Sequence, residues 1–268
     1  MMLIVLISWN ARADLERCLH SLIEAPPERP HTIAVVDNAS RDGSADMVAQ
    51  AFPAVRLIRS AENLGFARAN NLAIRETPGD PVLLLNPDTI VPPGAIDRLA
   101  DHLARHADAA AAGPRLVDGG GQPEISFGRL PSPFREGVRK TLSRLHARRV
   151  QPFTRWVDRQ TRRPQEVDWV SGAALLVRRQ AAEQAGLLDE HYQLYWEDID
   201  FCAALRARGW RILFTPDAEI THLRGRSAAA APAAAVRRAY RSAQLRFYAK
   251  HRPLWVRPLR LYQRLRYH

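Results

Sequence analysis

Three carboxylates lie within four positions of this 268-residue chain, at Glu197, Asp198 and Asp200, and this grouping could perform acid–base chemistry. Acidic residues are also ordinary in the first turn of a helix, where they complement the helix dipole. The aromatic residues beside them are Tyr192, Tyr195 and Trp196. An acid in apolar surroundings acquires a raised pKa and can act as a general base. The segment is therefore a candidate catalytic site.

Polar, turn-forming residues follow each of the first four apolar runs of the chain. These segments are Trp9-Asn10, Asp37-Asn38-Ala39-Ser40, Asn63-Leu64-Gly65-Phe66 and Asn86-Pro87-Asp88. Asp, Asn, Ser and Gly commonly end strands and cap helices, so turn formation explains each segment taken alone. Four such segments at one edge of a sheet indicate a ligand site, because open α/β sheets bind ligands outside the carboxyl ends of their strands.

The elements that would position these segments alternate between strand and helix patterns. Buried strands are predicted for the apolar runs Leu3–Ser8, Thr32–Val36, Val55–Ile58 and Val82–Leu85. Helices are predicted around Leu15–Ile23, after Gly43-Ser44, over Phe66–Arg75 and over Ile96–His106. This alternation predicts an α/β fold with parallel strands and helices on both faces.

The pattern changes in the second half, where Pro, Gly and basic residues interrupt it from Gly113 to Pro164. Strands are then predicted at Ala173–Val177, Arg211–Phe214 and Ala218–Thr221, and a helix at Ile199–Arg208. His222 follows the last of these strands, and a lone histidine is most often structural or at the surface. The segment Ala228–Ala235 is compatible with either a helix or a linker.

The composition is that of an ordinary globular protein, since 46% of the residues are apolar. The N-terminal apolar run lacks a basic leader and a cleavage site, and no segment has the length of a membrane span. We therefore expect a soluble, cytoplasmic protein. Cys18 and Cys202 lack metal-ligand spacing, and we expect them to be buried, free thiols in a reducing compartment.

The net charge of +11 is concentrated in two segments. Residues 129–163 carry 11 Lys and Arg against two acids, and residues 224–268 carry 12 against none. The aromatic residues interleaved in the second segment include Tyr240, Phe247, Trp255 and Tyr262. This pattern is typical of solvated, Arg-rich helices and of surfaces that contact anionic lipid headgroups. Charge alone would allow nucleic-acid binding, but no nucleic-acid motif accompanies it. We expect peripheral contact with an anionic membrane and no nucleic-acid partner. The alternative is that the C-terminal segment folds back on the acidic part of the chain or pairs with a second subunit.

The order and spacing of the motifs resemble family 2 glycosyltransferases with the GT-A fold, most closely their bacterial rhamnosyltransferase-like branch. The matching segments are Ile7-Ser8-Trp9-Asn10, Val36-Asp37-Asn38-Ala39-Ser40-Arg41-Asp42-Gly43-Ser44, Asn63-Leu64-Gly65-Phe66-Ala67-Arg68-Ala69-Asn70, Leu84-Leu85-Asn86-Pro87-Asp88-Thr89, Asp168-Trp169-Val170-Ser171-Gly172-Ala173, Tyr195-Trp196-Glu197-Asp198-Ile199-Asp200 and His222. They extend over roughly residues 2–225. The resemblance implies an α/β fold of the GT-A type, with a Rossmann-like mixed sheet flanked by helices.

The resemblance also implies a division of the chain. Residues 1–226 would form the glycosyltransferase domain, with a nucleotide-sugar-binding half at 1–112, a basic variable insert at 113–166 and an acceptor-binding and catalytic half at 167–226. Residues 227–268 would form a basic, helical C-terminal extension.

The roles of family residues are implied for the matching positions. Those implied to bind the nucleotide-sugar donor are Ser8, Trp9, Asn10, Asp37, Asn38, Asn63, Gly65, Arg68, Asn86 and Asp88. Those implied to bind the acceptor are Trp169, Gly172, Tyr195 and Trp196. The donor diphosphate calls for a divalent cation, Mg²⁺ or Mn²⁺, whose implied ligands are Asp88 and His222. Asn86 replaces the first acid of the family's metal motif, which makes Asp88 the direct ligand.

The implied reaction is a single displacement that inverts the anomeric centre. Asp198 matches the family's catalytic base, which takes the proton of the acceptor hydroxyl, and Glu197 is its neighbour. The implied function is transfer of rhamnose from dTDP-rhamnose to a glycan or lipid-linked glycan in cell-wall or polysaccharide biosynthesis, at the inner face of the cell membrane. Transfer of a hexose or of galactofuranose is the alternative within the family. A non-catalytic nucleotide-binding scaffold would lack Asp88 or Asp198, and both are present. The sequence leaves the oligomeric state open, a homo-oligomer included.

Overall fold

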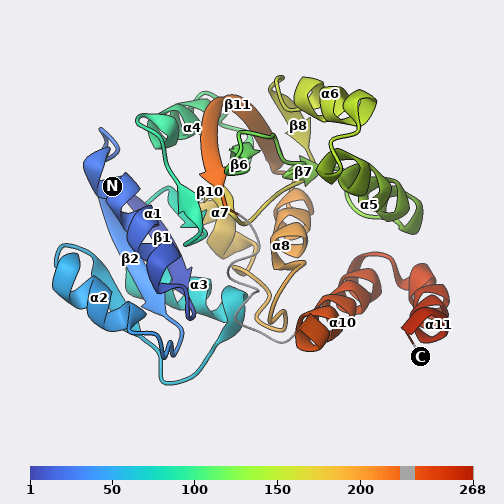
Figure 1. Ribbon diagram of the computed structural model, residues 1–268, viewed down its shortest axis with the longest axis horizontal. Helices are drawn as coiled ribbons and strands as arrows, with labels where there is room; N and C mark the ends of the chain where they lie inside the picture. Colours follow the sequence, from blue (N-terminus) through green and yellow to red (C-terminus); the bar gives the residue numbers. More distant parts are fainter. Residues whose placement is uncertain (224–232, 268) are drawn as a thin grey trace.

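The apolar N-terminal run forms β1 (Met2–Ser8), a fully buried strand in the central sheet of the protein. The computed structural model describes residues 1–223 and 233–267, which form an α/β fold around this sheet (Figure 1). Within these residues nine strands make up the sheet, in the order β3-β2-β1-β4-β10-β6-β11-β5 with β8 paired to β11. The bounds are β2 (His31–Asp37), β3 (Arg56–Arg59), β4 (Val82–Leu85), β5 (Thr89–Ile90), β6 (Ala109–Val117), β8 (Gln165–Val167), β10 (Ala174–Val177) and β11 (Arg211–His222).

The sheet is parallel in its first part and mixed in its second. β1 pairs in parallel with β2, with Ser8 opposite Asp37, and with β4 on its other side. β10 then runs antiparallel to both β4 and β6. The fully parallel sheet predicted from strand–helix alternation is therefore wrong beyond β4, whereas the mixed sheet that the resemblance implied is confirmed.

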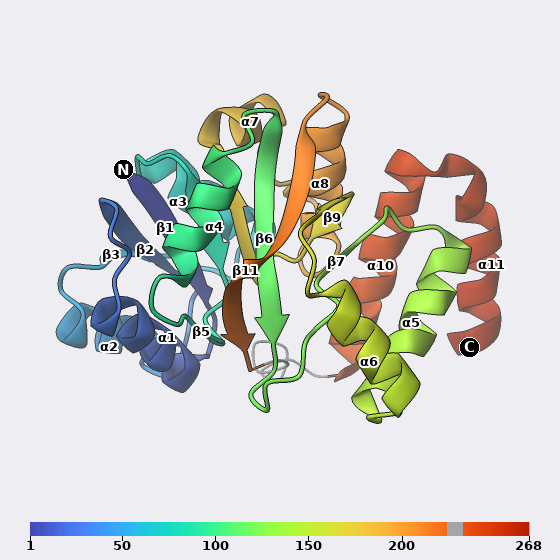
Figure 2. The ribbon, with the colours of Figure 1, turned by 90° about the horizontal axis from the view of Figure 1, so that it is seen from above.

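Helices cover both faces because successive side chains of a buried strand point to opposite sides. One face carries α1 (Arg12–Glu24), α2 (Ser44–Ala51) and α4 (Ala95–Ala104), and the other carries α3 (Gly65–Glu76), α7 (Arg179–Gln184) and α8 (Glu197–Arg206) (Figures 1 and 2). The alternation is visible in β1, where Leu3 and Val5 join one core and Ile4 and Leu6 the other. Cys18 and Cys202 are buried and unbridged, as predicted.

The interruption predicted from Gly113 to Pro164 contains more regular structure than its composition suggested. β6 runs through Gly113 to Val117, and its four alanines, Ala109–Ala112, are all buried. Alanine has a low strand propensity, which explains why the sequence pattern did not predict this strand. Gly113 is required by packing, because a Cβ at this position would lie 2.6 Å from the Val170 Cβ. The later elements are β7 (Phe127–Gly128), α5 (Pro133–Ala147), α6 (Gln151–Gln160) and β9 (Trp169–Val170).

The two strands predicted at Arg211–Phe214 and Ala218–Thr221 are one strand, β11. Its register against β6 shifts between Thr215 and Glu219, where Pro216 interrupts the pattern. The far end of β11 pairs with β5, with His222 opposite Thr89. This pairing brings His222 next to the Asn86-Pro87-Asp88 turn.

The C-terminal part of the chain forms α10 (Ala233–His251), a short 3₁₀ turn, η1 (Pro253–Trp255), and α11 (Val256–Tyr267). The predicted boundary at 226/227 and most of Ala228–Ala235 lie outside the described residues. Phe247 and Tyr248 of α10 are buried in the core, whereas Trp255 and Tyr262 are exposed. Among the described helices, none combines the length and the apolar composition needed to cross a membrane.

Candidate active site

A cavity of about 760 Å³ opens at the carboxyl ends of β1, β2 and β4 and extends to the first turn of α8. Its wall includes most of the residues that the sequence indicated. These are Trp9, Asn38, Asn63, Gly65, Arg68, Asn86, Asp88, Trp169, Gly172, Tyr195, Trp196, Glu197, Asp198 and His222. Ser8, Asn10 and Asp37 do not line it.

These three residues lie behind the cavity wall, where β1 and β2 end. Asn10 Oδ1 accepts a hydrogen bond from the Arg41 N–H at 2.7 Å, and its own N–H donates to Ser40 Oγ at 3.0 Å. Asn10 therefore connects the two turns. Asp37 Oδ2 accepts from the Ser40 N–H at 3.2 Å, while Asp37 Oδ1 and Ser8 Oγ are buried and have no hydrogen-bond partner among the described residues. Buried polar atoms are normally satisfied, so both atoms are suited to a polar ligand.

The turn after β3 is held against the turn after β2 by side-chain amides. Asn38 Nδ2 donates to Asn63 Oδ1 at 3.0 Å, and Asn38 Oδ1 accepts from the Leu64 N–H at 2.8 Å. Gly65 has a φ of +75°, and a Cβ at this position would lie 2.8 Å from the Gln193 carbonyl oxygen. The amide of Asn38 thus positions the loop after β3, and Gly65 permits this loop to approach Gln193 closely. Arg68, one turn further along α3, is half-exposed and 3.7 Å from Glu62.

Asp88 and His222 meet at the cavity wall, brought together by the pairing of β11 with β5. His222 Nε2 lies 3.4 Å from Asp88 Oδ1, and His222 Nδ1 lies 3.3 Å from Glu124 Oε2. Burial opposes a charge on His222, but the interactions with Asp88 and Glu124 outweigh it and raise the pKa of His222 to about 9. The buried Asp88 Oδ1 thus has His222 as its facing partner, at a distance longer than that of a normal hydrogen bond.

Glu197 and Asp198 begin α8 after a strained turn. Tyr195 and Trp196 have φ values of 69° and 72°, a left-handed conformation that is uncommon for bulky residues. Asp198 accepts hydrogen bonds from the Gly172 N–H at 3.0 Å and from the Ile199 N–H at 2.8 Å. A Cβ on Gly172 would lie 3.3 Å from the Asp198 Cβ, so the glycine allows this close contact.

The two carboxyls differ in their surroundings. Burial raises the pKa of Glu197, and the charge of Asp198 raises it further. Burial also raises the pKa of Asp198, but the Gly172 and Ile199 N–H groups and the charge of Arg139 counteract it. Glu197 Oε2 is buried and has no hydrogen-bond partner in the described part of the chain. The rise in the pKa of Asp198 is thus opposed by more lowering interactions, whereas the charge of Asp198 itself adds to the rise in the pKa of Glu197.

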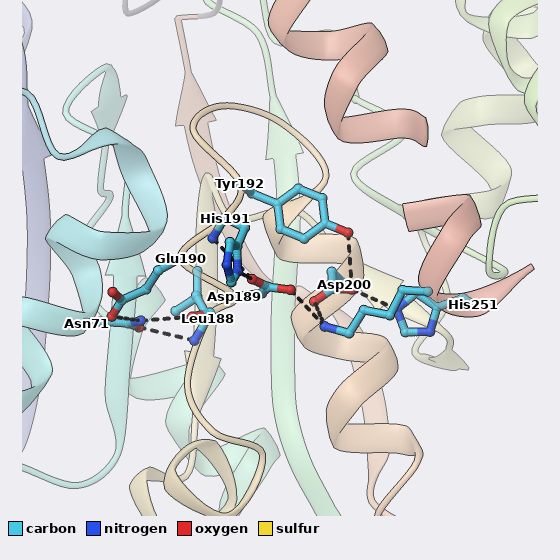
Figure 3. Close-up of polar contacts among 9 residues, drawn as sticks. Asn71, Leu188, Asp189, Glu190, His191, Tyr192, Asp200 and His251 are labelled. Carbon is cyan, nitrogen blue, oxygen red and sulfur yellow. Dashed lines mark hydrogen bonds and ion pairs between the residues drawn. The ribbon is translucent and has the colours of Figure 1, made fainter. Parts of the chain in front are cut away.

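Asp200, the third carboxylate of the sequence motif, points away from the cavity. It accepts a hydrogen bond from Tyr192 and is 2.7 Å from both Lys250 Nζ and His251 Nε2 of α10 (Figure 3). Lys250 also reaches Asp189 at 3.1 Å. The expectation that Asp200 could serve as a base is wrong, because its side chain is used to attach α10 to α8.

The predicted acceptor residues form the opposite wall. Trp169 is buried, and its Nε1–H donates to the Arg129 carbonyl at 3.1 Å. Trp196 is 3% exposed, and its ring packs on Phe247 and Tyr240 with centroid distances of 5.1 and 5.8 Å. The Trp196 side chain is therefore part of the core, and it connects the Tyr195–Trp196 turn to α10.

Sequence reasoning missed several residues that line the cavity. Glu124 follows β6, Arg139 lies on α5, and α10 contributes Val236, Ala239 and Tyr240. Glu124 was an isolated acid, and Arg139 was one of many arginines in a basic segment, so neither carried a signal in the sequence. The aromatic residues of α10 are visible in the sequence, but they fit a membrane-facing pattern as well as a buried one. In the structure Tyr240 and Phe247 pack on Trp196.

A family model described as glycosyl transferase family 2 matches residues 3–185. The N-acetylglucosaminyl-diphospho-decaprenol L-rhamnosyltransferase of Mycobacterium tuberculosis is 34% identical, over 96% of this chain and 87% of that protein. A low-salt glycan biosynthesis hexosyltransferase of Haloferax volcanii is 25% identical, over 76% of this chain and 61% of that protein.

Two solved structures share the fold. GalNAc-T7 with UDP, GalNAc and Mn²⁺ has a TM-score of 0.61 and 16% identity, over 83% of this chain and 43% of that chain. A mannosyltransferase from Pyrobaculum calidifontis in complex with GDP-Man and Mn²⁺ has a TM-score of 0.60 and 20% identity, over 97% of this chain and 68% of that chain.

Proposed function

The chain belongs to glycosyl transferase family 2, and we propose that it transfers rhamnose from dTDP-rhamnose to a lipid-linked, diphosphate-bearing glycan in cell-wall biosynthesis. The sugar and the acceptor are supported by the identity with the mycobacterial rhamnosyltransferase, which extends over nearly the whole chain. The observation that carries the proposal is that one cavity joins the Asp88–His222 pair to the buried carboxylate of Asp198.

Asp198 acts as the general base in this proposal. Its carboxylate lines the cavity, is fixed by two backbone N–H donors and ionises before Glu197. It would take the proton of an acceptor hydroxyl while that oxygen attacks the anomeric carbon and the diphosphate leaves. A single displacement of this kind inverts the anomeric configuration and requires no covalent intermediate.

The donor nucleotide would lie against the ends of β1 and β2. Asp37 Oδ1 and Ser8 Oγ are buried and not hydrogen-bonded within the described chain. Asp37 Oδ1 would accept a hydrogen bond from the pyrimidine or ribose, and Ser8 Oγ would donate or accept one. Trp9 lines the cavity beside them and offers a ring for stacking. Asn10, Asn38 and Asn63 would act by fixing the turns, since their amides are used within the protein.

The residues at the cavity wall fit a divalent cation. Asp88 supplies a buried carboxylate oxygen whose nearest partner is His222 Nε2 at 3.4 Å. The acidic neighbours of His222 raise its pKa to about 9, so His222 would give up its proton when it binds the cation. No group of three or more His, Cys, Asp or Glu side chains within 1–223 and 233–267 is arranged to hold a metal. Two protein ligands suit Mg²⁺ or Mn²⁺, which take further ligands from substrate phosphates. The bound cation would neutralise charge on the donor diphosphate.

A donor screen tests the proposal. Purified protein is mixed with dTDP-rhamnose, UDP-hexoses or UDP-galactofuranose, together with a short-chain alkyl diphosphate of N-acetylglucosamine and Mg²⁺ or Mn²⁺. We expect transfer from dTDP-rhamnose alone, with an inverted anomeric configuration in the product by NMR. Transfer from a UDP-hexose would assign the chain to the alternative donor class, and retention of configuration would exclude Asp198 as the base of a single displacement.

We further propose that the protein works at the inner face of the membrane as a peripheral protein. The acceptor of the mycobacterial relative carries a decaprenol, and exposed arginines gather on α11, at Arg257, Arg260 and Arg264. Arginine beside exposed aromatic residues such as Trp255 and Tyr262 favours an anionic lipid surface.

A further inference from the structure

A second cavity, of about 380 Å³, lies between α5, α6 and the β7–β9 pair, and we call it the α5–α6 groove. One wall is the stripe Phe134, Val138 and Leu142, which recur at helical spacing along α5. Trp156 and Val157 of α6 form the other wall. Phe134 is 79% exposed and Trp156 is 43% exposed, so large apolar side chains face water along the groove. Apolar surface concentrated in a groove is typical of a binding site.

The groove is continuous with the active-site cavity. Ile125, Arg139 and Trp169 line both spaces. The Arg139 guanidinium lies 5.7 Å from the centre of the Trp169 ring, and its charge acts on Asp198. A ligand with a hydroxyl at Asp198 could therefore pass Arg139 and continue between α5 and α6.

The charges along this path indicate the order of groups in such a ligand. Arg129, Arg135 and Arg139 line the groove together with the apolar stripe. Glu136 is the one acid among the described residues that line the groove. Its carboxylate accepts hydrogen bonds from Tyr248 and Gln244 at 2.6 and 2.7 Å, so it is turned toward α10. The path thus presents a base for a hydroxyl, then cationic groups for an anion, then an apolar groove for a hydrocarbon.

We propose that the α5–α6 groove binds the isoprenoid units next to the diphosphate of a polyprenyl-linked acceptor, and that Arg139 holds this diphosphate between the groove and Asp198. This inference rests on the proposed function, which supplies a polyprenyl-linked acceptor. It adds the part of the protein that binds the polyprenyl chain. The rest of the polyprenyl chain would leave the groove past the exposed Phe134, on the side of the molecule where α5, α10 and α11 gather (Figures 1 and 2).

A binding experiment tests the groove without requiring transfer activity. Farnesyl diphosphate, inorganic diphosphate and farnesol are titrated into the full-length protein by calorimetry. We expect farnesyl diphosphate to bind at least tenfold more tightly than inorganic diphosphate, because only its hydrocarbon reaches the apolar walls. Equal affinity for the two diphosphates would overturn the proposal, and binding of farnesol as tight as that of farnesyl diphosphate would remove Arg139 from it.

Matched variants locate the hydrocarbon. Phe134→Ser should weaken farnesyl diphosphate binding about tenfold and leave inorganic diphosphate unchanged. Ile23→Ser removes a side chain that is 47% exposed on α1, away from the groove, and should change neither. Val138→Ser is a second groove variant, and melting curves accompany all three. If Phe134→Ser and Val138→Ser both bind farnesyl diphosphate as the unaltered protein does, the hydrocarbon site lies elsewhere.

A kinetic experiment separates this inference from the proposed function. Transfer is measured with N-acetylglucosamine diphosphate carried on a long polyprenol or on a short alkyl chain. Phe134→Ser should raise KM for the polyprenyl acceptor several-fold and leave kcat and the short-chain acceptor unchanged. Transfer that is equally efficient for both acceptors, and insensitive to Phe134→Ser, would overturn the groove and preserve the proposed function. The protein could also transfer to neither acceptor while Phe134→Ser still weakens its binding of farnesyl diphosphate. That result would overturn the proposed function and preserve the lipid site.

Discussion

At the scale of single residues, the site separates two adjacent carboxyls by their hydrogen bonds. Asp198 accepts hydrogen bonds from two backbone N–H groups on its two oxygens. Backbone N–H groups also lower the pKa of Glu197, but its Oε2 has no partner among the described residues and the charge of Asp198 opposes its ionisation. Hydrogen bonds to the charged form favour ionisation, and burial without them opposes it. This difference supports the proposal that Asp198, the more readily ionised of the two, is the base.

Replacing Asp198 by asparagine should abolish transfer and preserve donor binding. We expect the rate to fall by about 10²–10⁴-fold, the usual range for removal of a general base. The asparagine has one acceptor oxygen for the two N–H donors, so the fold should also lose about 1–3 kcal/mol. Steady-state kinetics and a melting curve are the measurements, with the surface variant Asp46→Asn as the control. Near-normal transfer would move the base to Glu197.

The rate should depend on pH through Asp198. The base works in its deprotonated form, so kcat/KM should decline as the pH falls through the Asp198 pKa. Because burial raises this pKa, the acid limb should lie above the ordinary range of an aspartate. Arg139→Gln removes a charge that lowers the pKa and should move the limb to higher pH, whereas Glu197→Gln should leave it in place. If the acid limb of the kcat/KM profile does not move in Arg139→Gln, a group other than Asp198 controls the pH dependence.

Donor binding should require a divalent cation at Asp88. Without the cation, Asp88 and His222 largely neutralise each other and neither offsets the charge of the donor diphosphate, so we expect dTDP to bind at least tenfold more weakly in the presence of a chelator. Asp88→Asn should weaken binding in Mg²⁺ and remove most of the response to the chelator. Calorimetry with and without chelator measures both effects. Equal affinity under the two conditions in the unaltered protein would exclude a metal from donor binding.

At the scale of elements, α10 is part of the catalytic domain's core. Its Phe247 is fully buried against Trp196, and its Lys250 and His251 pair with Asp200, two residues beyond the base. The pairing with Asp200 holds the first turn of α8 (Figure 3), and the packing of Phe247 on Trp196 holds the strained Tyr195–Trp196 turn. The helix therefore stabilises the position of Asp198, although it lies far away in the sequence.

Phe247→Ala should destabilise the protein strongly. Truncating a buried phenylalanine costs about 3–5 kcal/mol, so the melting temperature should fall clearly. Phe134→Ala removes the same side chain from an exposed position, and its effect should stay within about 0.5 kcal/mol. Denaturant unfolding compares the two variants. Similar losses in both would show that α10 is not packed on Trp196 in solution.

At the scale of the whole molecule, the positive charge gathers on helices at one side of the sheet. α5, α6, α10 and α11 lie together there, with β1, β2 and β3 on the opposite side of the molecule (Figures 1 and 2). The exposed part of the C-terminal region is α11, whereas α10 turns its aromatic residues inward. Removing residues 224–268 would uncover Trp196 and leave Asp200 without Lys250 and His251, so a truncated chain is unsuitable for testing membrane contact.

Membrane contact should instead be tested by charge removal on α11. The full-length protein should sediment with anionic vesicles, but not with neutral ones, and high salt should release it. Each basic residue near an anionic leaflet contributes about 1 kcal/mol, so Arg257→Gln, Arg260→Gln and Arg264→Gln together should weaken binding about 100-fold. The control removes three arginines elsewhere, with Arg56→Gln, Arg59→Gln and Arg75→Gln. If both triple variants lose vesicle binding equally, the attraction depends on net charge and not on α11. If the unaltered protein does not sediment with anionic vesicles, membrane contact of this kind is excluded.

Local patterns in the sequence were sufficient to predict the elements whose signals come from neighbouring residues. Continuous apolar runs predicted β1, β2 and β4, and helical spacing predicted α1, α3 and α8, because each pattern depends on residues that are close in the chain. The polar turns at the strand ends indicated one edge of the sheet, and most of their residues do line a single cavity.

Which of these residues meet is a property of the folded chain. His222 becomes a partner of Asp88 because β11 is one bent strand that pairs with β5, and Asp200 leaves the site because α10 supplies its cations. β6 is a strand because it pairs with β10 and β11 in the middle of the sheet, in spite of the low strand propensity of its alanines. Such outcomes depend on packing and pairing between segments about 50–135 residues apart, and no local pattern encodes them.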